Sequence, residues 1–435
     1  MLYSEVLEYL YQQLPVFQNQ GASALKAGLN GIQLLCDFLG NPEKKIKTIH
    51  IAGTNGKGST SHMLASILQE SDYKTGLYTS PHLVDFRERI RINGQLISET
   101  FVIDFVNQNK SFFDKNSFSF FEVTVALAFK YFADNEVDIA VIEVGLGGRL
   151  DSTNIITPLL SIITNISDDH KQILGETLPE IALEKAGIIK PNVPVVISTK
   201  QPQIDEIFIE KARELKAEIY FADQNFTLSS SEINNNFHKI VVKNKRDNEF
   251  NTVELDLLGT YQKYNVLGVL QAVLVLKSIG FDLSNNNLQN GLKNTCANTG
   301  LLGRWQIIQQ KPLVICDTGH NYAGITEVVK NIENQKFEQL HIVIGFVKDK
   351  EIDKILTLLP QNAQYYFCNA DIPRALPAEN LCEIAAQYGL NGIWYHSVEL
   401  AYLKALKTAK ITDLVFIGGS TFVVADFLKY KLINN

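Results

Sequence analysis

The segment His50-Ile51-Ala52-Gly53-Thr54-Asn55-Gly56-Lys57-Gly58-Ser59-Thr60 decides the fold class of this chain. It joins a β-branched run, Thr48 to Ala52, to a stretch with amphipathic helical spacing. Glycines let backbone N–H groups approach phosphate oxygens, and a helix N-terminus favours anions. Lys57 can reach the β and γ phosphates of a nucleotide. The segment therefore predicts a phosphate-binding loop between a strand and a helix.

This loop departs from the usual pattern G-x-x-x-x-G-K-[ST]. Ile51 stands at the position of the first glycine, and Gly58 intervenes before Ser59. Ser59 is the hydroxyl that we expect to hold Mg²⁺ beside the phosphates. A glycine-rich turn without a ligand is the alternative interpretation.

Short β-branched runs alternate with segments of helical period from Ile46 onward, which is typical of parallel strands joined by crossover helices. The expected strands are Thr48 to Ala52, Asp138 to Val144, Leu160 to Ile166 and Val193 to Ser198. Each is followed by Gly, Asp or Asn. Because ligands collect at the carboxyl ends of such strands, these ends are the expected site.

The alternation stops near Asn225 and resumes in the last third of the chain. Between the two parts we expect an antiparallel edge hairpin, then a helix, then a linker rich in Gly, Asn and Thr. The hairpin strands are His238 to Val242 and Thr252 to Leu257, the helix is Tyr264 to Ile279, and the linker is Asn294 to Gly303. The later strands are Leu313 to Cys316, His341 to Ile344, Gln364 to Cys368 and Asp413 to Ile417.

A length of 435 residues fits two domains. We therefore expect an α/β protein with a phosphate-loop domain and mostly parallel sheet at residues 1–296. A smaller Rossmann-like α/β domain is expected at residues 297–435, and the two should close over the nucleotide by hinging at the linker.

Composition excludes several classes of protein. A net charge of −7 argues against nucleic-acid binding, which needs a surplus of Lys and Arg. The N-terminus lacks a basic region followed by an apolar run, and no stretch approaches the ~20 apolar residues of a membrane span. We expect a cytoplasmic protein. The five cysteines are scattered without a C-x-x-C pair, so we interpret them as reduced bystanders.

Two further polar segments follow expected strands. Glu143 ends the apolar run Ile139 to Ile142, and a charge at that place needs a partner. Mg²⁺ is the natural partner, and an ion pair with Arg149 is the alternative. The segment Thr164 to His170 closes another strand, although a lone histidine such as His170 is usually structural.

Two other segments have less obvious roles. Lys185 lies late in a predicted helix, where chemistry alone indicates a surface residue that complements the helix dipole. In the last third of the chain, Asp317-Thr318-Gly319-His320-Asn321 ends a strand and opens a helix, and Gly303-Arg304 follows the linker. These groups are candidates for nucleotide contacts from the second domain.

Taken together, the chain resembles the folylpolyglutamate synthase and dihydrofolate synthase family, a branch of the Mur ligases, and its bifunctional bacterial type in particular. Five segments carry the resemblance in the order and approximate spacing of the family: Gly53 to Thr60, Thr79 to Leu83, Glu88 to Gly94, Glu143 to Asp151 and Glu184 to Ile188. Four positions depart from the family pattern: Leu302 stands for a proline, Thr318-Gly319 for Gly-Ala, and Asn30 for an acidic residue.

The resemblance implies an ATP-dependent ligase that phosphorylates the carboxylate of a pteroate or folate. The amino group of L-glutamate then attacks the acyl phosphate, releasing ADP and phosphate. The implied cofactors are ATP and two Mg²⁺ ions. The implied partners are small-molecule substrates, and the implied oligomeric state is a monomer. Ser59, Ser80, Glu143, His170 and Lys185 are implied as metal ligands, the last as a carbamate.

Other roles also follow from the resemblance. Implied catalytic residues are Lys57, Lys185 and His320, the last near the attacking amine. Implied ATP contacts are Asn55, Gly56, Lys57, Gly58, Ser59, Thr60, Asn265, Arg304 and Asp317. Implied substrate contacts are Gly28, Leu29, Asn30, Ser119, Phe120, Phe121, Glu122, Arg149, Asp151, Ser152 and Ser420.

Three alternatives remain beside the folate ligase. One is another Mur-type amino-acid ligase, against which the segment from Thr79 to Asn93 argues. Another is a P-loop kinase or NTPase, for which Lys185 would be dispensable. The third is a non-catalytic nucleotide-binding protein, disfavoured because the expected metal ligands are complete.

Overall fold

The computed structural model describes residues 1–12, 14, 28–234, 236–348 and 350–434. The chain divides into two compact units. The first comprises Met1–His82, Arg87–Asp256 and Gln262–Leu301, and the second comprises Leu83–Phe86, Leu257–Tyr261 and Leu302–Asn435. We expected the boundary after residue 296, and the last segment of the first unit ends five residues later, at Leu301.

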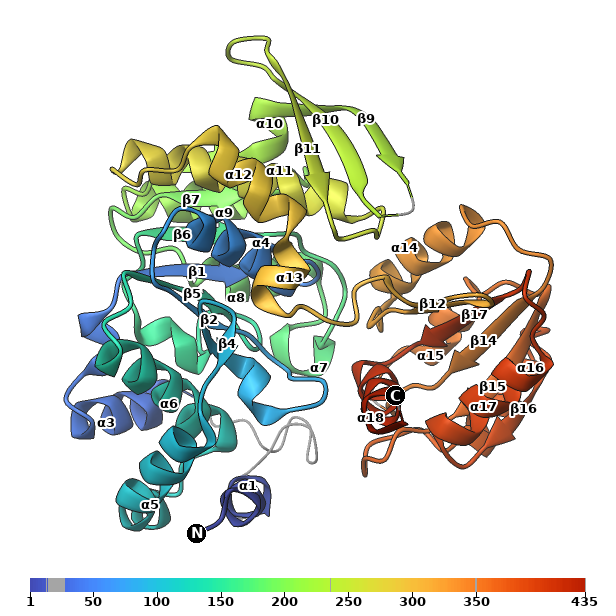
Figure 1. Cartoon of the computed structure of the whole chain (residues 1–435). Coiled ribbons are helices and arrows are strands. Elements are labelled where there is room, and N and C mark those ends of the chain that lie inside the picture. The colour runs from blue at the N-terminus through green and yellow to red at the C-terminus, as the bar shows by residue number, and fades with distance from the viewer. Residues whose placement is uncertain (13, 15–27, 235, 349, 435) are drawn as a thin grey trace. The chain divides into compact units, whose positions relative to one another are not determined.

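An eight-stranded sheet organises the first unit (Figure 1). The strands run in the order β4-β3-β2-β5-β1-β6-β7-β8, and β2, β5, β1, β6, β7 and β8 are mutually parallel. Their bounds are β1 (Thr48–Ala52), β2 (Thr75–Tyr78), β3 (Ile90–Ile92), β4 (Gln95–Leu96), β5 (Ile139–Glu143), β6 (Leu160–Ile163), β7 (Val195–Ile197) and β8 (Ile219–Phe221). All four strands expected from the sequence in this part of the chain are present.

Strand β1 lies at the centre of this sheet, and every one of its residues is buried. It pairs with β5 on one side, where Ile51 is opposite Glu143, and with β6 on the other, where Ala52 is opposite Ile163. The loops that follow these three strands therefore start at the same edge of the sheet. This placement explains why three polar motifs distant in the sequence belong to one site.

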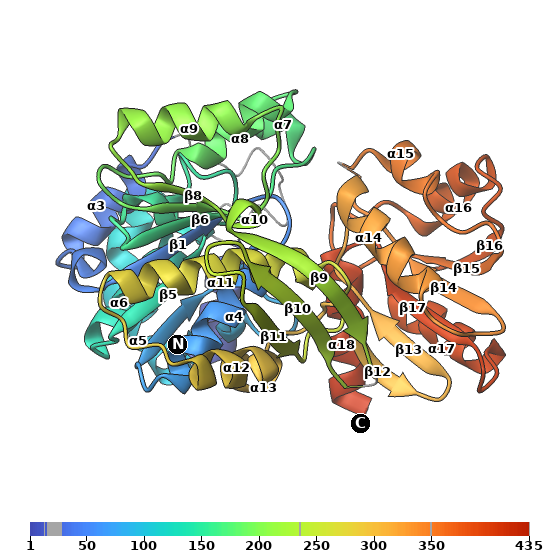
Figure 2. The same cartoon turned by 90° about the horizontal axis from the view of Figure 1, so that it is seen from above.

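Helices cover both faces of the sheet. In Figure 2, α8 and α9 lie on one side of β6 to β8 and α11 lies on the other. The helices of the first unit are α1 (Tyr3–Gln12), α3 (Asn30–Phe38), α4 (Lys57–Glu70), α5 (Glu99–Asn116), α6 (Phe120–Asp134), α7 (Lys171–Leu174), α8 (Leu178–Ala186), α9 (Asp205–Glu214), α10 (Ala222–Asn225), α11 (Gln262–Ser278), α12 (Asn285–Lys293) and α13 (Thr295–Thr299). Short 3₁₀ turns span Pro42–Lys45, Phe86–Arg89 and Ser152–Ile155.

The two expected hairpin strands are present and antiparallel, but the prediction of an edge hairpin is wrong in extent and place. Strands β9 (Phe226–Ile233), β10 (His238–Asn244) and β11 (Phe250–Leu255) form an antiparallel sheet of their own. Figure 2 shows this sheet extending away from the eight-stranded one. Strand β9 contains the run Thr-Leu-Ser-Ser-Ser-Glu, and most of its side chains are not buried. A strand without an apolar face gives no periodic signal in the sequence.

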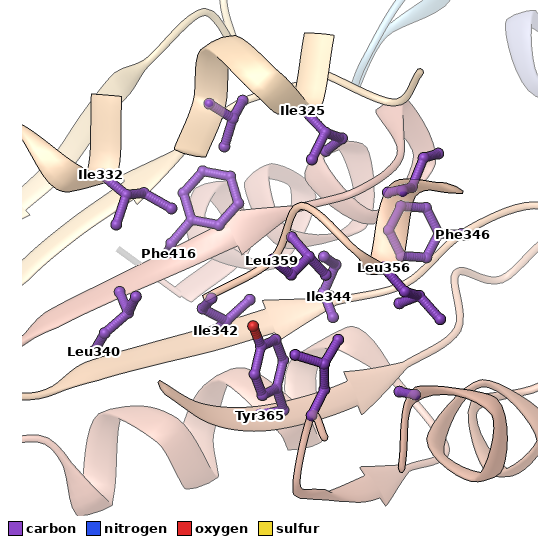
Figure 3. Close-up of a cluster of buried hydrophobic side chains, with 14 of the residues drawn as sticks. Ile325, Ile332, Leu340, Ile342, Ile344, Phe346, Leu356, Leu359, Tyr365 and Phe416 are labelled. Carbon is purple, nitrogen blue, oxygen red and sulfur yellow. The ribbon is translucent and has the colours of Figure 1, made fainter. Parts of the chain in front are cut away.

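The second unit contains a six-stranded sheet in the order β12-β13-β17-β14-β15-β16, in which only β12 is antiparallel to its neighbour. The strands are β12 (Gln306–Gln310), β13 (Leu313–Cys316), β14 (Leu340–Ile344), β15 (Ala363–Cys368), β16 (Gly392–Tyr395) and β17 (Leu414–Gly418). The helices are α14 (Tyr322–Glu333), α15 (Ile352–Leu356), α16 (Ala378–Ala386), α17 (Val398–Thr408) and α18 (Thr421–Asn434). Figure 3 shows one core of this unit, where Ile325 and Ile332 of α14 face Phe416 of β17.

The expected linker from Asn294 to Gly303 is partly wrong, because α13 occupies its first half. The carboxylate of Asp256 accepts a hydrogen bond from the backbone of Cys296 (2.7 Å), which holds the first turn of α13. The five cysteines are free thiols, as expected. Within the described ranges, no helix is long and apolar enough to cross a membrane.

Candidate active site

The phosphate-loop segment turns sharply between β1 and α4. Gly53 has φ of 142° and Gly56 has φ of 87°, values that favour glycine. A Cβ atom at Gly53 would lie 1.9 Å from Oγ1 of Thr164, so the close approach of β6 also requires glycine. Lys57 begins α4, and its ammonium donates to the carbonyl oxygens of Gly53 (3.0 Å) and Thr54 (3.2 Å).

The loop after β6 holds the phosphate loop in shape. The backbone N–H of Thr54 donates to the carbonyl of Asn165 (2.8 Å), and that of Asn55 donates to the side-chain oxygen of Asn165 (3.0 Å). The hydroxyl of Thr54 donates to the carbonyl of Ser167 (3.2 Å) and accepts from its N–H (3.0 Å). The two loops thus form one hydrogen-bonded unit, and this role of Asn165 was not predicted.

Ser59 lies in the first turn of α4 and is buried. Its Oγ accepts a hydrogen bond from Nε2 of Gln262 (3.1 Å), and Oε1 of Gln262 accepts from Nδ2 of Asn265 (2.8 Å). The oxygen of Asn265 lies against Gly56, where a Cβ atom would come within 2.3 Å of it. The structure therefore brings together three expected residues, and it adds Gln262, which sequence reasoning missed.

Glu143 ends β5 beside the phosphate loop and is 4% exposed. Its Oε2 accepts a hydrogen bond from the backbone N–H of Ser80 (2.9 Å). The alternative partner, Arg149, instead pairs with Glu184 at 2.7 Å. The ion pair between Glu143 and Arg149 considered from the sequence is therefore wrong.

The surface position expected for Lys185 from side-chain chemistry alone is wrong. Instead of lying at the surface, Lys185 is 4% exposed, and its Nζ donates to the carbonyl of Gly53 (2.9 Å). Burial, together with the positive charge of Lys57, lowers the pKa of Lys185 to about 7. The end of α8, which carries Lys185, packs closely against Gly148. A Cβ atom at Gly148 would lie 2.8 Å from the carbonyl oxygen of Glu184.

His170 follows β6 and caps α7 in a left-handed conformation, with φ of 52°. It is half-buried beside Asp169, whose Oδ2 lies 3.8 Å from its Nε2. Gln201 secures the base of this loop, because its carboxamide donates to the carbonyl and accepts from the N–H of Ile166, both at 2.8 Å. Gln201 is a further residue that the sequence did not reveal.

Several expected substrate contacts have structural bonds of their own. Ser119 and Glu122 form the capping box of α6, with the Glu122 carboxylate accepting from the Ser119 N–H (2.7 Å). Phe120 is buried and stacks on Tyr11, whereas Phe121 packs against Gly145. Ser152 begins a 3₁₀ turn that follows Asp151, and Gly28, Leu29 and Asn30 lead into α3.

Asp151 organises the loop after β5. Its Oδ2 accepts from the N–H of Leu146 (2.8 Å), and its Oδ1 accepts from the hydroxyl of Thr153 (2.5 Å). That hydroxyl also lies 2.8 Å from Nε2 of the buried His50 in β1. Burial raises the pKa of the Asp151 carboxyl, and these hydrogen bonds oppose the rise.

In the second unit, Asp317 directly follows β13 and accepts three hydrogen bonds. The donors are the Tyr261 hydroxyl (2.6 Å) and the N–H groups of Trp305 and Gly319 (both 2.7 Å). His320 lies on the same turn, and Arg304 contacts it from the segment before β12. His320 Nδ1 is 3.0 Å from the Thr318 carbonyl, and the Arg304 guanidinium donates to the Thr318 hydroxyl. Ser420 is buried and accepts from the Phe422 N–H at the start of α18. Tyr261 was not predicted.

Two family models match the chain. The Mur ligase middle domain matches residues 51–273, and the Mur ligase glutamate ligase domain matches residues 303–421. The first match covers strands of the eight-stranded sheet, and the second covers the six-stranded sheet. The fold and the phosphate loop thus define a Mur-type ligase.

Relatives identify the branch. Dihydrofolate synthase/folylpolyglutamate synthase of Bacillus subtilis is 34% identical over 418 residues, covering 93% of this chain and 95% of the relative. The protein of the same name from Escherichia coli is 30% identical over 418 residues, covering 96% and 94%. The chain belongs to the dihydrofolate synthase/folylpolyglutamate synthase family of Mur ligases.

Solved structures agree with this membership. E. coli FolC in complex with DHPP and ADP has a TM-score of 0.85 at 28% identity, covering 100% of this chain and 98% of the other. Folylpolyglutamate synthase from Thermotoga maritima has a TM-score of 0.81 at 33% identity, covering 100% and 97%. The predicted fold class and family are therefore confirmed.

Proposed function

We propose that this chain joins L-glutamate to the carboxylate of dihydropteroate and of folates that already carry glutamate, using ATP. The observation that carries the proposal is the buried Lys185 ammonium on the carbonyl of Gly53, 2.9 Å away. A phosphate loop of an ordinary kinase has no need of a second buried lysine beneath it. Membership of the ligase family supports the same reaction.

The residues at the carboxyl edge of the sheet suit hard divalent cations. Glu143 brings a buried carboxylate to the loop that holds the Ser59 hydroxyl, and His170 follows the adjacent strand β6. Oxygen-rich donor sets of this type match Mg²⁺, which also binds substrate phosphates. We propose Ser59, Ser80, Glu143, His170 and Lys185 as the groups that hold two Mg²⁺ ions. When bound, these ions neutralise charge on the phosphoryl group.

Lys185 fits this set as a carbamate. A lysine whose pKa lies near 7 is partly neutral at neutral pH, and its neutral amine can attack CO₂. The N–C bond forms, one proton leaves, and the product is an anion with two oxygen atoms. This conversion replaces a costly buried cation with a group that suits a metal site.

The phosphate loop supplies the positioning for phosphoryl transfer. In the first step a substrate carboxylate oxygen bonds to the γ-phosphorus of ATP, and the bond to the β-phosphate oxygen breaks, releasing ADP. We propose that Lys57 and the backbone of Asn55 to Thr60 hold the phosphates, as their place at the start of α4 permits. Asn265, Arg304 and Asp317 are proposed as further ATP contacts.

The second step forms the amide. The glutamate nitrogen attacks the acyl carbon, the bond to phosphate breaks, and the amine gives up a proton. We propose that His320 lies near this amine and that Ser420 contacts the substrate. Gly28, Leu29, Asn30, Phe121, Arg149 and Ser152 are proposed to contact the pteroate, with Phe121 as a stacking surface.

Ser119, Phe120, Glu122 and Asp151 have structural partners in this conformation, so we propose that they shape the substrate site around Phe121. We also propose domains at 1–296 and 297–435, a monomer that acts on small molecules alone, and a cytoplasmic location. Free cysteines support that location, because thiols stay reduced there.

The discriminating experiment replaces Lys185 with alanine and measures ADP release with dihydropteroate, L-glutamate and Mg·ATP. The ligase proposal expects loss of at least about 100-fold in rate, on the scale of a lost metal ligand. A kinase or NTPase would retain its rate. Lys190→Ala is the control, because Lys190 is also a partly buried lysine but bonds to the Asn154 carbonyl.

A further inference from the structure

Gln262 is a buried carboxamide whose two ends are both engaged by proposed site residues. It is the first residue of α11 and is 0% exposed. Its Nε2 donates to Oγ of Ser59 (3.1 Å), and its Oε1 accepts from Nδ2 of Asn265 (2.8 Å). Burying an amide is costly unless both ends find partners. Here the partners are side chains of the proposed site and not the surrounding backbone.

The bond to Ser59 fixes how that hydroxyl can be used. A hydroxyl oxygen has two lone pairs and one proton. The amide donor occupies one lone pair, so the other stays available to a cation while the rotation of the hydroxyl is restricted. Without Gln262, the buried Ser59 hydroxyl would rotate toward another acceptor in α4.

The bond to Asn265 fixes a second group. The two amides lie three residues apart, so they share one face of α11. Asn265 is also buried, and its Oδ1 approaches Gly56 so closely that no Cβ atom could stand there. Helix α11 packs against α4, which brings this face to the start of the phosphate loop. Gln262 thus links the Ser59 hydroxyl on α4 to the Asn265 amide on α11.

We propose that Gln262 is a positioning residue that orients Ser59 and Asn265 for binding of the Mg²⁺ nucleotide. It contacts neither phosphate nor metal and acts through these two side chains. The inference rests on the proposed roles of Ser59 and Asn265 in nucleotide binding, and it adds a residue that those roles depend on. Residues of this kind typically change metal affinity 10- to 100-fold when replaced.

The test compares two buried glutamines of the same helix. Gln262→Met keeps the length of the side chain and removes both hydrogen bonds. Gln271→Met is the matched control, because Gln271 is also buried in α11 but bonds to Asn225 (2.7 Å). Calorimetry measures the Kd of ADP with saturating Mg²⁺, and thermal unfolding measures the Tm of each variant.

We expect Gln262→Met to weaken Mg²⁺-dependent ADP binding by about 10-fold or more. Gln271→Met should leave that Kd within about two-fold of the wild type, although it lowers the Tm to a similar extent. Equal Kd values for the two variants would overturn the proposal. If Gln262→Met does not fold, Gln262→Asn replaces it, because a shorter amide cannot reach both partners.

A double-mutant cycle separates positioning from general damage. In a Ser59→Ala background, Gln262→Met should weaken ADP binding much less than it does alone, because one of the groups it orients is gone. Fully additive losses would contradict the proposal. Failure of the proposed function looks different, since a wild-type protein that binds Mg²⁺ and ADP but adds no glutamate would leave this comparison intact.

Discussion

Lys57 and Lys185 share one acceptor, the carbonyl oxygen of Gly53, at 3.0 Å and 2.9 Å. Two ammonium groups this close repel each other, and only Lys185 is fully buried. Burial of Lys185, with the repulsion from Lys57 as a smaller contribution, lowers its pKa to about 7. The carbonyl of Gly53 therefore holds a buried lysine of lowered pKa next to the phosphate loop.

A carbamate on Lys185 should depend on pH in a defined way. Because the neutral amine attacks CO₂, its formation should increase as pH rises through about 7, the pKa of Lys185. Incubation with ¹³C-bicarbonate followed by NMR should show a carbamate carbon at pH 8 that is weaker at pH 6. The signal should be absent from Lys185→Met. Equal signals in the variant and the wild type would contradict the assignment.

The same lysine should influence stability. In the folded protein Lys185 loses its proton near pH 7, whereas the unfolded chain keeps it until near 10.5. The unfolded state thus binds more protons between these values, so wild-type stability should rise with pH there. Relative to Lys185→Met, the free energy of unfolding should increase by up to about 1.4 kcal/mol per pH unit. Urea titrations at pH 6.5 and 9 without bicarbonate measure it, and a constant difference would refute it.

Glu143 should be essential for metal use but not for folding. Glu143→Gln keeps the acceptor for the Ser80 N–H and removes the charge. We expect ADP release to fall about 100-fold or more, or to require much higher Mg²⁺, with Tm near that of the wild type. Asp138→Asn is the control, because Asp138 immediately precedes the same strand and caps the Lys74 N–H. Loss of activity in both variants would point to damage of β5 instead.

Thr153 should matter for stability because it joins His50 to Asp151. Burial and the charge of Lys190 lower the pKa of His50 to about 3, so its imidazole is neutral. Because the Thr153 hydroxyl gives its one proton to Asp151, the Nε2–H of His50 is the donor to that hydroxyl. Thr153→Val removes the acceptor of His50 and one of the donors to Asp151, and should cost about 1–3 kcal/mol in the free energy of unfolding. Thr153→Ser keeps the hydroxyl and should recover most of it. A larger loss in Thr153→Ser than in Thr153→Val would show that the methyl group, and not the hydroxyl, is important.

Local patterns predicted much of the fold correctly. The strands Thr48–Ala52 and Leu313–Cys316 have the predicted bounds, since each is a short run with β-branched residues that lies between turn signals. The phosphate loop follows from its own residues. Short strands such as β3 and β4, and the polar β9, lack a sufficient apolar period and were missed.

Relationships between distant residues were beyond such patterns. Lys185 contacts a carbonyl 132 residues earlier, so its helix alone indicated a surface position. The first turn of α13 is held by Asp256, 40 residues earlier, in a stretch that looked like a linker. Gln262 bonds to Ser59 across 203 residues. Tertiary packing decides these contacts, and only the family resemblance pointed to Lys185.

Mass analysis of pterin products tests the central claim most directly. The purified protein is incubated with Mg·ATP and L-glutamate, with dihydropteroate in one tube and tetrahydrofolate in the other. We expect a gain of one glutamyl unit in both tubes, with one ADP formed for each amide. A gain with tetrahydrofolate alone would restrict the activity to polyglutamylation, and no gain in either tube would contradict the proposed function.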